Sequence, residues 1–499
     1  MYRFHRTAAL LAAAVMALLS PFPSLAAGPG EGLSSSNAPI IAGSGSSSGT
    51  TDASGSAGQD ASKSADPLAA IRPAMALSHN GDLGQDPVLG LVPLATYHLY
   101  DGDGQRVDYG YTHEADSFAY AGGGFNRILL EHQNVGRWYY RTYSANTGWG
   151  PWAISGETTP DRGQVQAVMF RVKGYTHKFG ELYYRAVLND GTTTDWARAG
   201  QACGVIGGER YIVALKLALW NRTVPFEGAV EKPLANENNE GIVKADGGVG
   251  YSTADGHAYT GWAFDEDSNQ YYFENGFAST GWKAIEGYNY YFYENGILAK
   301  DLEPVMGLQS SYAIRINKAT RSFYVLTKDA AGQYTIPYKT FMCTVGPDTP
   351  IGSFKIYQQY RWHFMHADCY TQFLSRFNGH FLIHSLLYTK PDLYSFTAAN
   401  YNYMDQAQSG GCVRLKASDS AWVYNNCKGG TPVTVYADRW DKGPVEKDAI
   451  EQAIPLAQNY DPTDPVILSQ QSAADAAAAA AAQEAAEQEA ANGEVEPNA

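Results

Sequence analysis

The chain has 499 residues, a formal net charge of −15 and abundant tyrosine (35) and glycine (51). This length exceeds that of one ordinary domain. The negative charge argues against nucleic-acid binding, and it gives no electrostatic help to the binding of polyanionic polymers. Because the composition favours β-rich modules with aromatic surfaces, we expect a multidomain, mainly β protein.

The N-terminal segment has the pattern of a secretory signal peptide, residues 1–26. Arg3 and Arg6 make a short basic region, residues 8–19 are apolar, and Ser24-Leu25-Ala26 is a small-x-small cleavage site. We expect export after cleavage at Ala26; an uncleaved N-terminal anchor is the alternative. Residues 27–88, rich in Ser, Gly, Ala and Asp, are predicted to be a flexible tether.

Residues 89–225 contain an internal repeat. Tyr139-Tyr140-Arg141 recurs as Tyr183-Tyr184-Arg185, Trp152 maps onto Trp196, and both copies end in alternating apolar runs that predict strands. The copies resemble the clostridial hydrophobic repeats with a conserved tryptophan found in Gram-positive surface proteins. That resemblance implies an extracellular interaction module, although we favour a core position for most of these tryptophans. Residues 89–134 carry no clear pattern.

A sharper repeat lies at 249–304, after a predicted linker at 226–248. Thr260-Gly261-Trp262 recurs as Thr280-Gly281-Trp282, and 271–276 recurs as 291–296. A unit of this size cannot bury its own aromatic face, so neighbouring hairpins should stack. The pattern resembles the choline- and glucan-binding wall repeats of Gram-positive bacteria. The resemblance implies that cell-wall polysaccharide or a teichoic-acid-type polymer is bound by Trp262, Tyr271, Tyr272, Trp282, Tyr291 and Phe292. A role as a spacer is the alternative.

Residues 308–440 are predicted to form a further, mainly β domain. Alternation at 312–316 and 323–326 around a turn predicts an opening hairpin, and 431–436 a closing strand. Ser418 is predicted to N-cap a short helix that ends before Gly429. The Ala/Glu-rich tail, 441–499, has no apolar stripe in its alanine tract, so we expect a solvated helix or disorder there.

The chemistry of this domain is predicted at Ser409-Gly410-Gly411-Cys412-Val413-Arg414. Glycines beside a cysteine let backbone N–H groups approach a reacting carbonyl. A thiol also needs a nearby base, and His384, at the end of the strand-like run 381–383, is the candidate. A structural histidine or a Cys412–Cys427 disulfide are the alternatives.

The cysteine count is compatible with a free nucleophile. An odd number, Cys203, Cys343, Cys369, Cys412 and Cys427, leaves at least one thiol unpaired or paired between chains outside the cell. Cys343, Cys369 and Cys427 are predicted to be structural. The cysteine and histidine spacings predict no metal site, and we expect no cofactor.

Residues 311–437 resemble the catalytic domain of the L,D-transpeptidases (YkuD-like). The matching motifs occur in the family's order and are Asn317-Lys318-Ala319-Thr320, 349–354, Ile383-His384-Ser385 and 409–415. The resemblance implies a β-rich fold with Cys412 as nucleophile, His384 as base, the Ser385 carbonyl orienting the imidazole, and the backbone of Gly410, Gly411 and Cys412 as oxyanion hole. Many members have a second histidine where this chain has Gly410.

The resemblance further implies a secreted, wall-associated enzyme of a Gram-positive-type bacterium that forms 3→3 cross-links between peptidoglycan stem peptides. An L,D-carboxypeptidase on the same substrate and a catalytically inactive wall-binding protein are the alternatives. A sortase-like enzyme fits less well, because it would need a Thr-x-Thr-Cys strand. No nucleic acid partner and no membrane span after signal cleavage are expected.

Further residues are candidates for substrate binding. Arg414 either holds a substrate carboxylate or braces the turn, and bracing is the interpretation we favour. The segment 388–404 is rich in tyrosine and is interpreted as a lid or cleft wall, with a surface loop as the alternative. The remaining candidates are Ser409, Tyr388, Trp362, Arg361 and Arg376.

Overall fold

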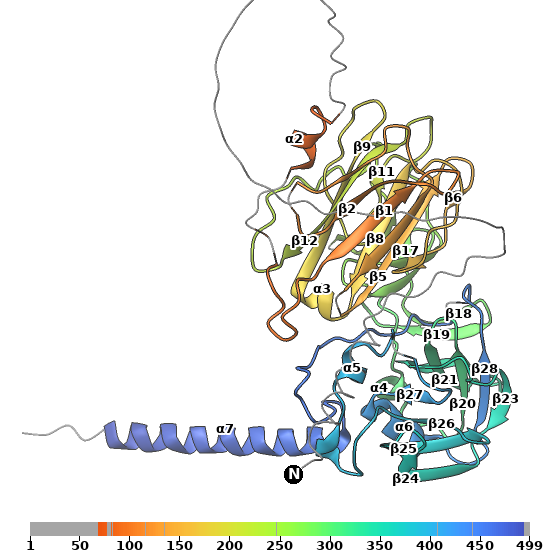
Figure 1. Cartoon of the computed structure of the whole chain (residues 1–499), viewed down its shortest axis with the longest axis vertical. Coiled ribbons are helices and arrows are strands. Elements are labelled where there is room, and N and C mark those ends of the chain that lie inside the picture. Colours follow the sequence, from red (N-terminus) through yellow and green to blue (C-terminus); the bar gives the residue numbers. More distant parts are fainter. Residues whose placement is uncertain are drawn as a thin grey trace, which may run out of the picture. The chain divides into compact units, whose positions relative to one another are not determined.

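The computed structural model describes residues 68–493, apart from 77–80, 82, 115, 134, 246, 407 and 442. The chain divides into two units, Met1–Asp66 and Pro67–Ala499, and the description below concerns the second. The predicted signal peptide and most of the predicted tether therefore lie outside the described residues. The described part is mainly β, which confirms the predicted fold class (Figure 1).

Residues 95–221 form antiparallel sheets with the strand orders β2-β1-β4, β10-β9-β12-β3 and β11-β8-β5-β6, with β7 also paired to β5. The segment 89–134, which gave no clear pattern, supplies the first four strands. The strands are β1 (Ala95–Tyr100), β2 (Arg106–Tyr111), β3 (Ala119–Tyr120), β4 (Arg127–His132), β5 (Arg137–Ser144), β6 (Gly148–Trp149), β7 (Ala153–Ile154), β8 (Ala167–Lys173), β9 (Gly180–Leu188), β10 (Ala197–Arg198), β11 (Cys203–Gly204) and β12 (Ile212–Asn221), with the helix α3 (Tyr175–Phe179) after β8.

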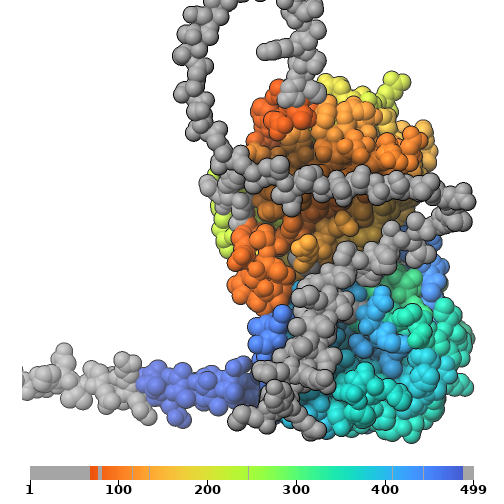
Figure 2. All heavy atoms as spheres, in the orientation of Figure 1, coloured from red at the N-terminus to blue at the C-terminus, as the bar shows by residue number. Residues whose placement is uncertain are grey.

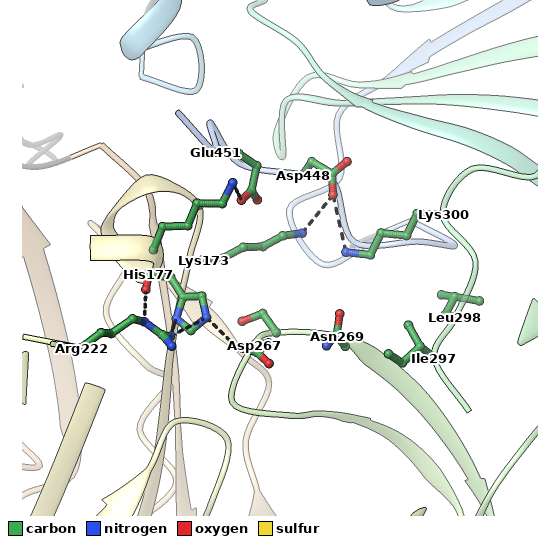
Figure 3. A pocket seen from close by; sticks show the side chains of 13 residues that line it. Lys173, His177, Arg222, Asp267, Asn269, Ile297, Leu298, Lys300, Asp448 and Glu451 are labelled. Carbon is green, nitrogen blue, oxygen red and sulfur yellow. Dashed lines mark hydrogen bonds and ion pairs between the residues drawn. The ribbon is translucent and has the colours of Figure 1, made fainter. Parts of the chain in front are cut away.

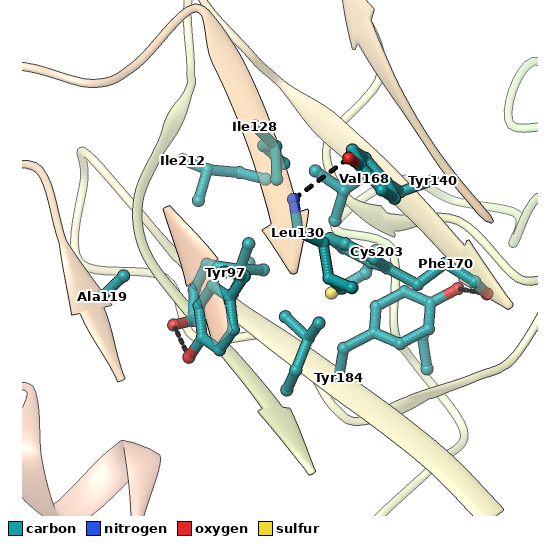
Figure 4. Packing of buried hydrophobic residues seen from close by; sticks show 14 of the residues in the cluster. Tyr97, Ala119, Ile128, Leu130, Tyr140, Val168, Phe170, Tyr184, Cys203 and Ile212 are labelled. Carbon is teal, nitrogen blue, oxygen red and sulfur yellow. Dashed lines mark hydrogen bonds between the residues drawn. The ribbon is translucent and has the colours of Figure 1, made fainter. Parts of the chain in front are cut away.

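The core of these sheets places the two repeat copies in equivalent environments. Tyr140 in β5 and Tyr184 in β9 are both fully buried and both pack against Phe170 (Figure 4). Their hydroxyl groups donate to carbonyl oxygens, because a buried phenol needs a partner. Trp196 is buried as expected for a core residue. The strands β8 and β12 do not alternate, since both of their faces are covered.

The aromatic repeat forms hairpins that stack as predicted. Trp262 pairs across its own hairpin with Tyr272, and its ring lies 5.1 Å from that of Tyr290 in the next hairpin. Stacking buries Tyr271 and Phe292 and leaves Trp282 47 % exposed. The strands are β13 (Gly241–Ala245), β14 (Gly248–Ser252), β15 (Gly261–Phe264), β16 (Gln270–Glu274), β17 (Phe277–Ala278), β18 (Gly281–Ile285) and β19 (Tyr288–Phe292).

The next domain contains two sheets, β22-β21-β20-β28-β23 and β24-β25-β26-β27. The predicted opening hairpin is β20 with β21, and the predicted closing strand is β28, which pairs parallel with β20. The elements are α4 (Glu303–Met306), β20 (Tyr312–Asn317), β21 (Ser322–Lys328), β22 (Tyr334–Met342), β23 (Gly352–Lys355), β24 (Gln358–Met365), β25 (Cys369–Asn378), β26 (Phe381–Ser385), η2 (Leu393–Ser395), α5 (Ala399–Asn402), β27 (Val413–Leu415), α6 (Ala417–Asn426) and β28 (Pro432–Tyr436).

Three predicted boundaries differ from the structure. The predicted linker 226–248 contains the strand β13, which pairs antiparallel with β14. In the predicted tether, Met75 of the helix α2 (Arg72–Met75) is fully buried and clusters with Val187 and Val213. In the predicted low-complexity tail, the segment 444–464 is packed: Ile450 and Ile454 lie in a cluster with Val135. The latter two segments were grouped with low-complexity neighbours in the sequence, but their apolar residues pack against partners far away along the chain.

The tail beyond this segment is the helix α7 (Pro465–Gly493), which projects away from the body of the unit (Figure 1, Figure 2). Its side chains are exposed over 468–486, as expected for an alanine-rich helix without an apolar stripe. Within the described residues, no helix combines the length and apolar character that a membrane crossing requires.

Candidate active site

The pairing of β26 with β27 brings the predicted nucleophile and base together. The two strands are parallel, with Ile383 opposite Val413 and His384 opposite Arg414. Paired residues share a face and successive residues alternate. Ile383, Val413 and Leu415 are fully buried in the core on one face. His384, Arg414 and Cys412, which directly precedes β27, therefore share the opposite face.

The imidazole of His384 is held in one tautomer. Its Nδ1 lies 2.6 Å from the carbonyl oxygen of Ser385, so Nδ1 carries the proton and donates it. Nε2 is then the basic nitrogen, and among the described residues it has no hydrogen-bond partner. Burial, helped by the positive charge of Arg414, lowers the pKa of His384 to about 3. The ring is therefore neutral at physiological pH.

The thiol of Cys412 is half-buried and neutral at rest. Its Sγ lies 3.9 Å from the carbonyl oxygen of His380, and no hydrogen bond joins it to His384. Burial raises the pKa of Cys412, while a backbone hydrogen bond from Leu382 and the charges of Arg414 and Arg376 act in the opposite direction. The site thus pairs a protonated thiol with a neutral imidazole that has a free acceptor nitrogen.

The loop before Cys412 is braced by hydroxyl groups. Ser409 is buried, and its Oγ donates to the carbonyl oxygen of Cys412 at 2.6 Å and accepts from the N–H of Gly411 at 3.1 Å. Thr349 Oγ1 donates to the carbonyl oxygen of Gly411 at 2.8 Å. Ser409 therefore shapes the loop and does not offer its hydroxyl to a substrate. The role of Thr349 was not predicted, although its motif was recognised.

The two glycines of the motif have different surroundings. Gly411 has φ +146°, and a Cβ there would lie 2.5 Å from Cε1 of Phe381. A Cβ on Gly410 would meet nothing within 4 Å. Gly411 is thus required by the backbone and by Phe381, whereas Gly410 is exposed and leaves room for a side chain.

Arg414 does not brace the turn in the way that we favoured. Within the described residues no carbonyl or carboxylate oxygen accepts a hydrogen bond from its guanidinium group, and its Nε is buried without a partner. Arg376 pairs with Leu382, and its guanidinium group donates to the carbonyl oxygen of Gly379 at 2.6 Å. An unpaired, half-buried guanidinium beside the thiol suits a substrate carboxylate.

Three other substrate-binding candidates contact one another or Gln372. Full burial rules out Tyr388, whereas substrate binding by the partly exposed Trp362 and Arg361 stays a prediction. Tyr388 is fully buried, and its hydroxyl oxygen accepts from Gln372 Nε2 at 2.7 Å. Trp362 packs edge-on against Tyr388. Arg361 donates to Gln372 Oε1 at 2.6 Å.

The predicted lid, 388–404, is likewise part of a core. Phe396 and Tyr401 are buried together with Ile450 and Ile454. The apolar partners of these rings come from 444–464, which the sequence assigned to a low-complexity tail. Tyr394 is 50 % exposed, and a role of the segment as a lid or cleft wall stays a prediction.

The strand β26, which carries His384, is held in place by Gln372 and by the C-terminal segment 444–464. Neither contact was predicted from the sequence. The N–H of Gln372 donates to Ser385 Oγ at 2.9 Å, and Gln372 Nε2 donates to Asp464. Asp461 accepts from the N–H of Ala417, so α6 is capped by this segment and not by Ser418. No local sequence signal links positions so far apart.

None of the other cysteines forms a disulfide with Cys412. All five are free, and Cys343 and Cys427 are fully buried. Cys369 is half-buried at the start of β25. The described residues contain no group of three or more His, Cys, Asp or Glu side chains arranged to hold a metal ion.

Residues 311–435 match the YkuD family, described as an L,D-transpeptidase catalytic domain. Similar solved structures include an L,D-transpeptidase from Stackebrandtia nassauensis (18 % identity, 26 % of this chain, 58 % of that chain, TM-score 0.20) and L,D-transpeptidase 1 from Mycobacterium tuberculosis (18 %, 26 %, 62 %, 0.20). A fused Zn-dependent amidase/peptidase protein from Clostridium acetobutylicum is also similar (21 %, 25 %, 52 %, 0.20). The chain spans roughly half to three-fifths of the length of these structures. No curated protein matched the chain.

Proposed function

We propose, from the premise that residues 311–435 form an L,D-transpeptidase catalytic domain, that this protein is a secreted enzyme that forms 3→3 cross-links in peptidoglycan through a thioester on Cys412. The observation that carries the proposal is the shared face of Cys412 and His384 on adjacent strands, with Nε2 of His384 as an unoccupied acceptor. A thiol and an acceptor nitrogen in this relation are the elements of nucleophilic acyl transfer.

The first half-reaction begins from the neutral pair. The Cys412 side chain rotates away from the carbonyl oxygen of His380, and its proton passes to His384 Nε2 as sulfur attacks the carbonyl carbon of the third stem-peptide residue. The tetrahedral intermediate collapses, the C–N bond breaks, and the imidazolium gives its proton to the amine of the departing D-alanine. The product is a thioester. Because the resting pKa of His384 is low, its protonation is expected only together with the attack.

The second half-reaction returns the enzyme to its resting state. A side-chain amine of another stem peptide attacks the thioester, His384 takes the amine proton, and the thiolate leaves and is reprotonated by His384. Attack by water instead would give an L,D-carboxypeptidase. The Gly411 N–H is engaged by Ser409 Oγ. We therefore assign oxyanion stabilisation first to the N–H of Cys412, with Gly411 joining only if that bond breaks.

The aromatic repeat supports wall association through fewer residues than the sequence implied. Trp282 is 47 % exposed, Tyr293 is 40 % exposed, and Tyr291 contacts both rings. These rings form an exposed platform on which a sugar can stack. Tyr271 and Phe292 are buried and hold the hairpins together. We propose wall polysaccharide as the ligand of the platform, in keeping with an enzyme secreted to a Gram-positive-type wall.

Incubation with a disaccharide-tetrapeptide tests the proposed activity. Mass spectrometry of the products should show a cross-linked dimer and released D-alanine, and the Cys412→Ala variant should give neither. The Cys427→Ala variant should retain the activity, because Cys427 is buried in the core. Only trimmed tripeptide would identify a carboxypeptidase, and an unchanged substrate would favour an inactive wall-binding protein.

A further inference from the structure

A charged cavity of about 630 Å³ lies outside the candidate active site. Lys173 at the end of β8, Arg222 after β12, Lys300 after β19 and Asp448 in the C-terminal segment line it (Figure 3). Asn269, from the turn between β15 and β16, adds an uncharged polar group. Cavities of this size commonly hold a small ligand or one segment of a polymer.

On one wall, the positive groups outnumber the carboxylates. The Nζ atoms of Lys173 and Lys300 lie 3.4 and 3.6 Å from the same oxygen, Oδ1 of Asp448 (Figure 3). Glu446 also lies 3.7 Å from Lys173 Nζ, but its two oxygens are bound by the terminal nitrogens of the buried Arg171. Burial and the charge of Lys173 lower the pKa of Lys300 to about 8. Three cationic side chains, Lys173, Lys300 and Arg171, thus face two carboxylates, Glu446 and Asp448, which leaves this wall one negative charge short.

On another wall, a guanidinium group lacks an acidic partner. Arg222 Nε donates to the carbonyl oxygen of His177 at 2.8 Å, and its terminal nitrogen lies 3.0 Å from Nε2 of the same histidine (Figure 3). Among the described residues no carboxylate pairs with Arg222. His177 itself contacts Asp267, and burial together with Arg222 lowers the pKa of His177. The uncharged ring therefore does not compete with Arg222 for an anion.

We propose that this cavity binds an anionic oxygen group, a carboxylate or a phosphate, carried by a segment of wall polymer. The Lys173–Lys300 pair and Arg222 would supply the charge, and Asn269 a further polar contact. An anion bound there would balance the positive charge of these three side chains, which the carboxylates of the cavity do not fully balance. Because the chain as a whole carries a net charge of −15, a polyanion would be attracted locally and repelled elsewhere. The choice of a wall polymer rests on the proposed function, whereas the charge argument does not.

Binding to the full chain carrying Cys412→Ala tests this proposal, because that substitution prevents turnover. Isothermal titration at low ionic strength would use poly(glycerol phosphate) as the phosphate source and a disaccharide-tetrapeptide as the carboxylate source. We expect one of them to bind, with at least a tenfold loss of affinity in Lys300→Gln and, separately, in Arg222→Gln. Whichever of the two ligands binds identifies the anionic group as a phosphate or a carboxylate.

Lys232→Gln is the matched control, since it removes one exposed lysine charge outside the cavity. Affinity equal to that of the parent in both cavity variants, or no binding of either polymer, would overturn the proposal. Two independent cavity variants are used so that the folding of one does not decide the result. Acylation of Cys412 in a Lys300→Gln chain is measured in parallel: its persistence alongside absent polymer binding would leave the proposed enzyme function standing.

Discussion

His384 Nδ1 lies 2.6 Å from the carbonyl oxygen of Ser385, the next residue in the same strand. This contact fixes the tautomer without any acidic residue, because a backbone carbonyl accepts the Nδ1 proton. Ser385 is itself held through Gln372 and, beyond it, Asp464. The groups that contact His384 and Ser385 directly are therefore a backbone carbonyl and a backbone N–H, which do not titrate, and the acidic Asp464 lies one contact further away.

The neutral resting pair predicts how the thiol responds to pH. Because the pKa of Cys412 is raised and that of His384 is about 3, no imidazolium stabilises a thiolate near neutrality. We expect alkylation of Cys412 by iodoacetamide to rise about tenfold per pH unit between about pH 6 and 8.5. Peptide mapping by mass spectrometry would follow the site. A plateau below about pH 7 would show a preformed ion pair and contradict the account.

A His384→Gln variant separates ionisation from catalysis. Since the histidine is neutral in the resting enzyme, the alkylation profile should keep its position on the pH axis while cross-linking is lost. A profile that moves to higher pH in this variant would mean that an imidazolium had been lowering the pKa of the thiol.

The glycine pair before Cys412 provides a matched structural test. Gly411→Ala places a Cβ 2.5 Å from Phe381 at a positive φ, so we expect a loss of activity of at least about a hundredfold and a lower melting temperature. Gly410→Ala adds a Cβ in open space and should leave both nearly unchanged. Thermal melts and cross-linking rates of the two variants check this, and equal effects would contradict the described loop.

Arg414 is expected to bind a carboxylate group of the donor stem peptide through its guanidinium group. A hydrogen bond to a charged group contributes about 1.5–3 kcal/mol, so Arg414→Gln should lower kcat/KM roughly 10- to 150-fold. A donor with a C-terminal carboxamide should already react slowly with the wild type and be little affected by the substitution. Arg439→Gln, which changes an exposed arginine, is the control. Equal losses with the acid and amide donors would assign Arg414 a role in folding instead.

The features predicted from sequence were those encoded locally. Alternation and a turn predicted the β20–β21 hairpin, and the motif around Cys412 identified a loop that the structure places beside His384. The supports of that loop depend on distant contacts. Asp461 caps α6 across many residues, and Ile450 shares a buried cluster with Tyr401 although the sequence assigned Ile450 to a low-complexity tail. Burial, which the sequence does not show, also decides which aromatic rings of the repeat are open to a ligand, because rings of the same type lie both in the core and at the surface.

The buried pair of Arg171 and Glu446 links that C-terminal segment to β8. Arg171 is 1 % exposed and packs over the rings of Tyr139 and Phe264. The Glu446→Ala substitution leaves the guanidinium charge of Arg171 buried without a carboxylate partner. We therefore expect the free energy of unfolding to fall by about 3–5 kcal/mol. Urea unfolding followed by tryptophan fluorescence measures this.

Glu451→Ala serves as the control for that measurement. Its partner Lys178 is exposed, so the loss should stay below about 1 kcal/mol. Comparable losses in Glu446→Ala and Glu451→Ala would mean that the buried pair contributes no more than a surface ion pair.

Intact-mass analysis after incubation with a carbapenem tests most directly whether Cys412 is an acyl-transfer nucleophile. We expect one adduct of the drug's mass, located on Cys412 by peptide mapping, absent from Cys412→Ala and retained in Cys427→Ala. An unmodified wild-type chain, under conditions that acylate an L,D-transpeptidase of known activity, would contradict the account.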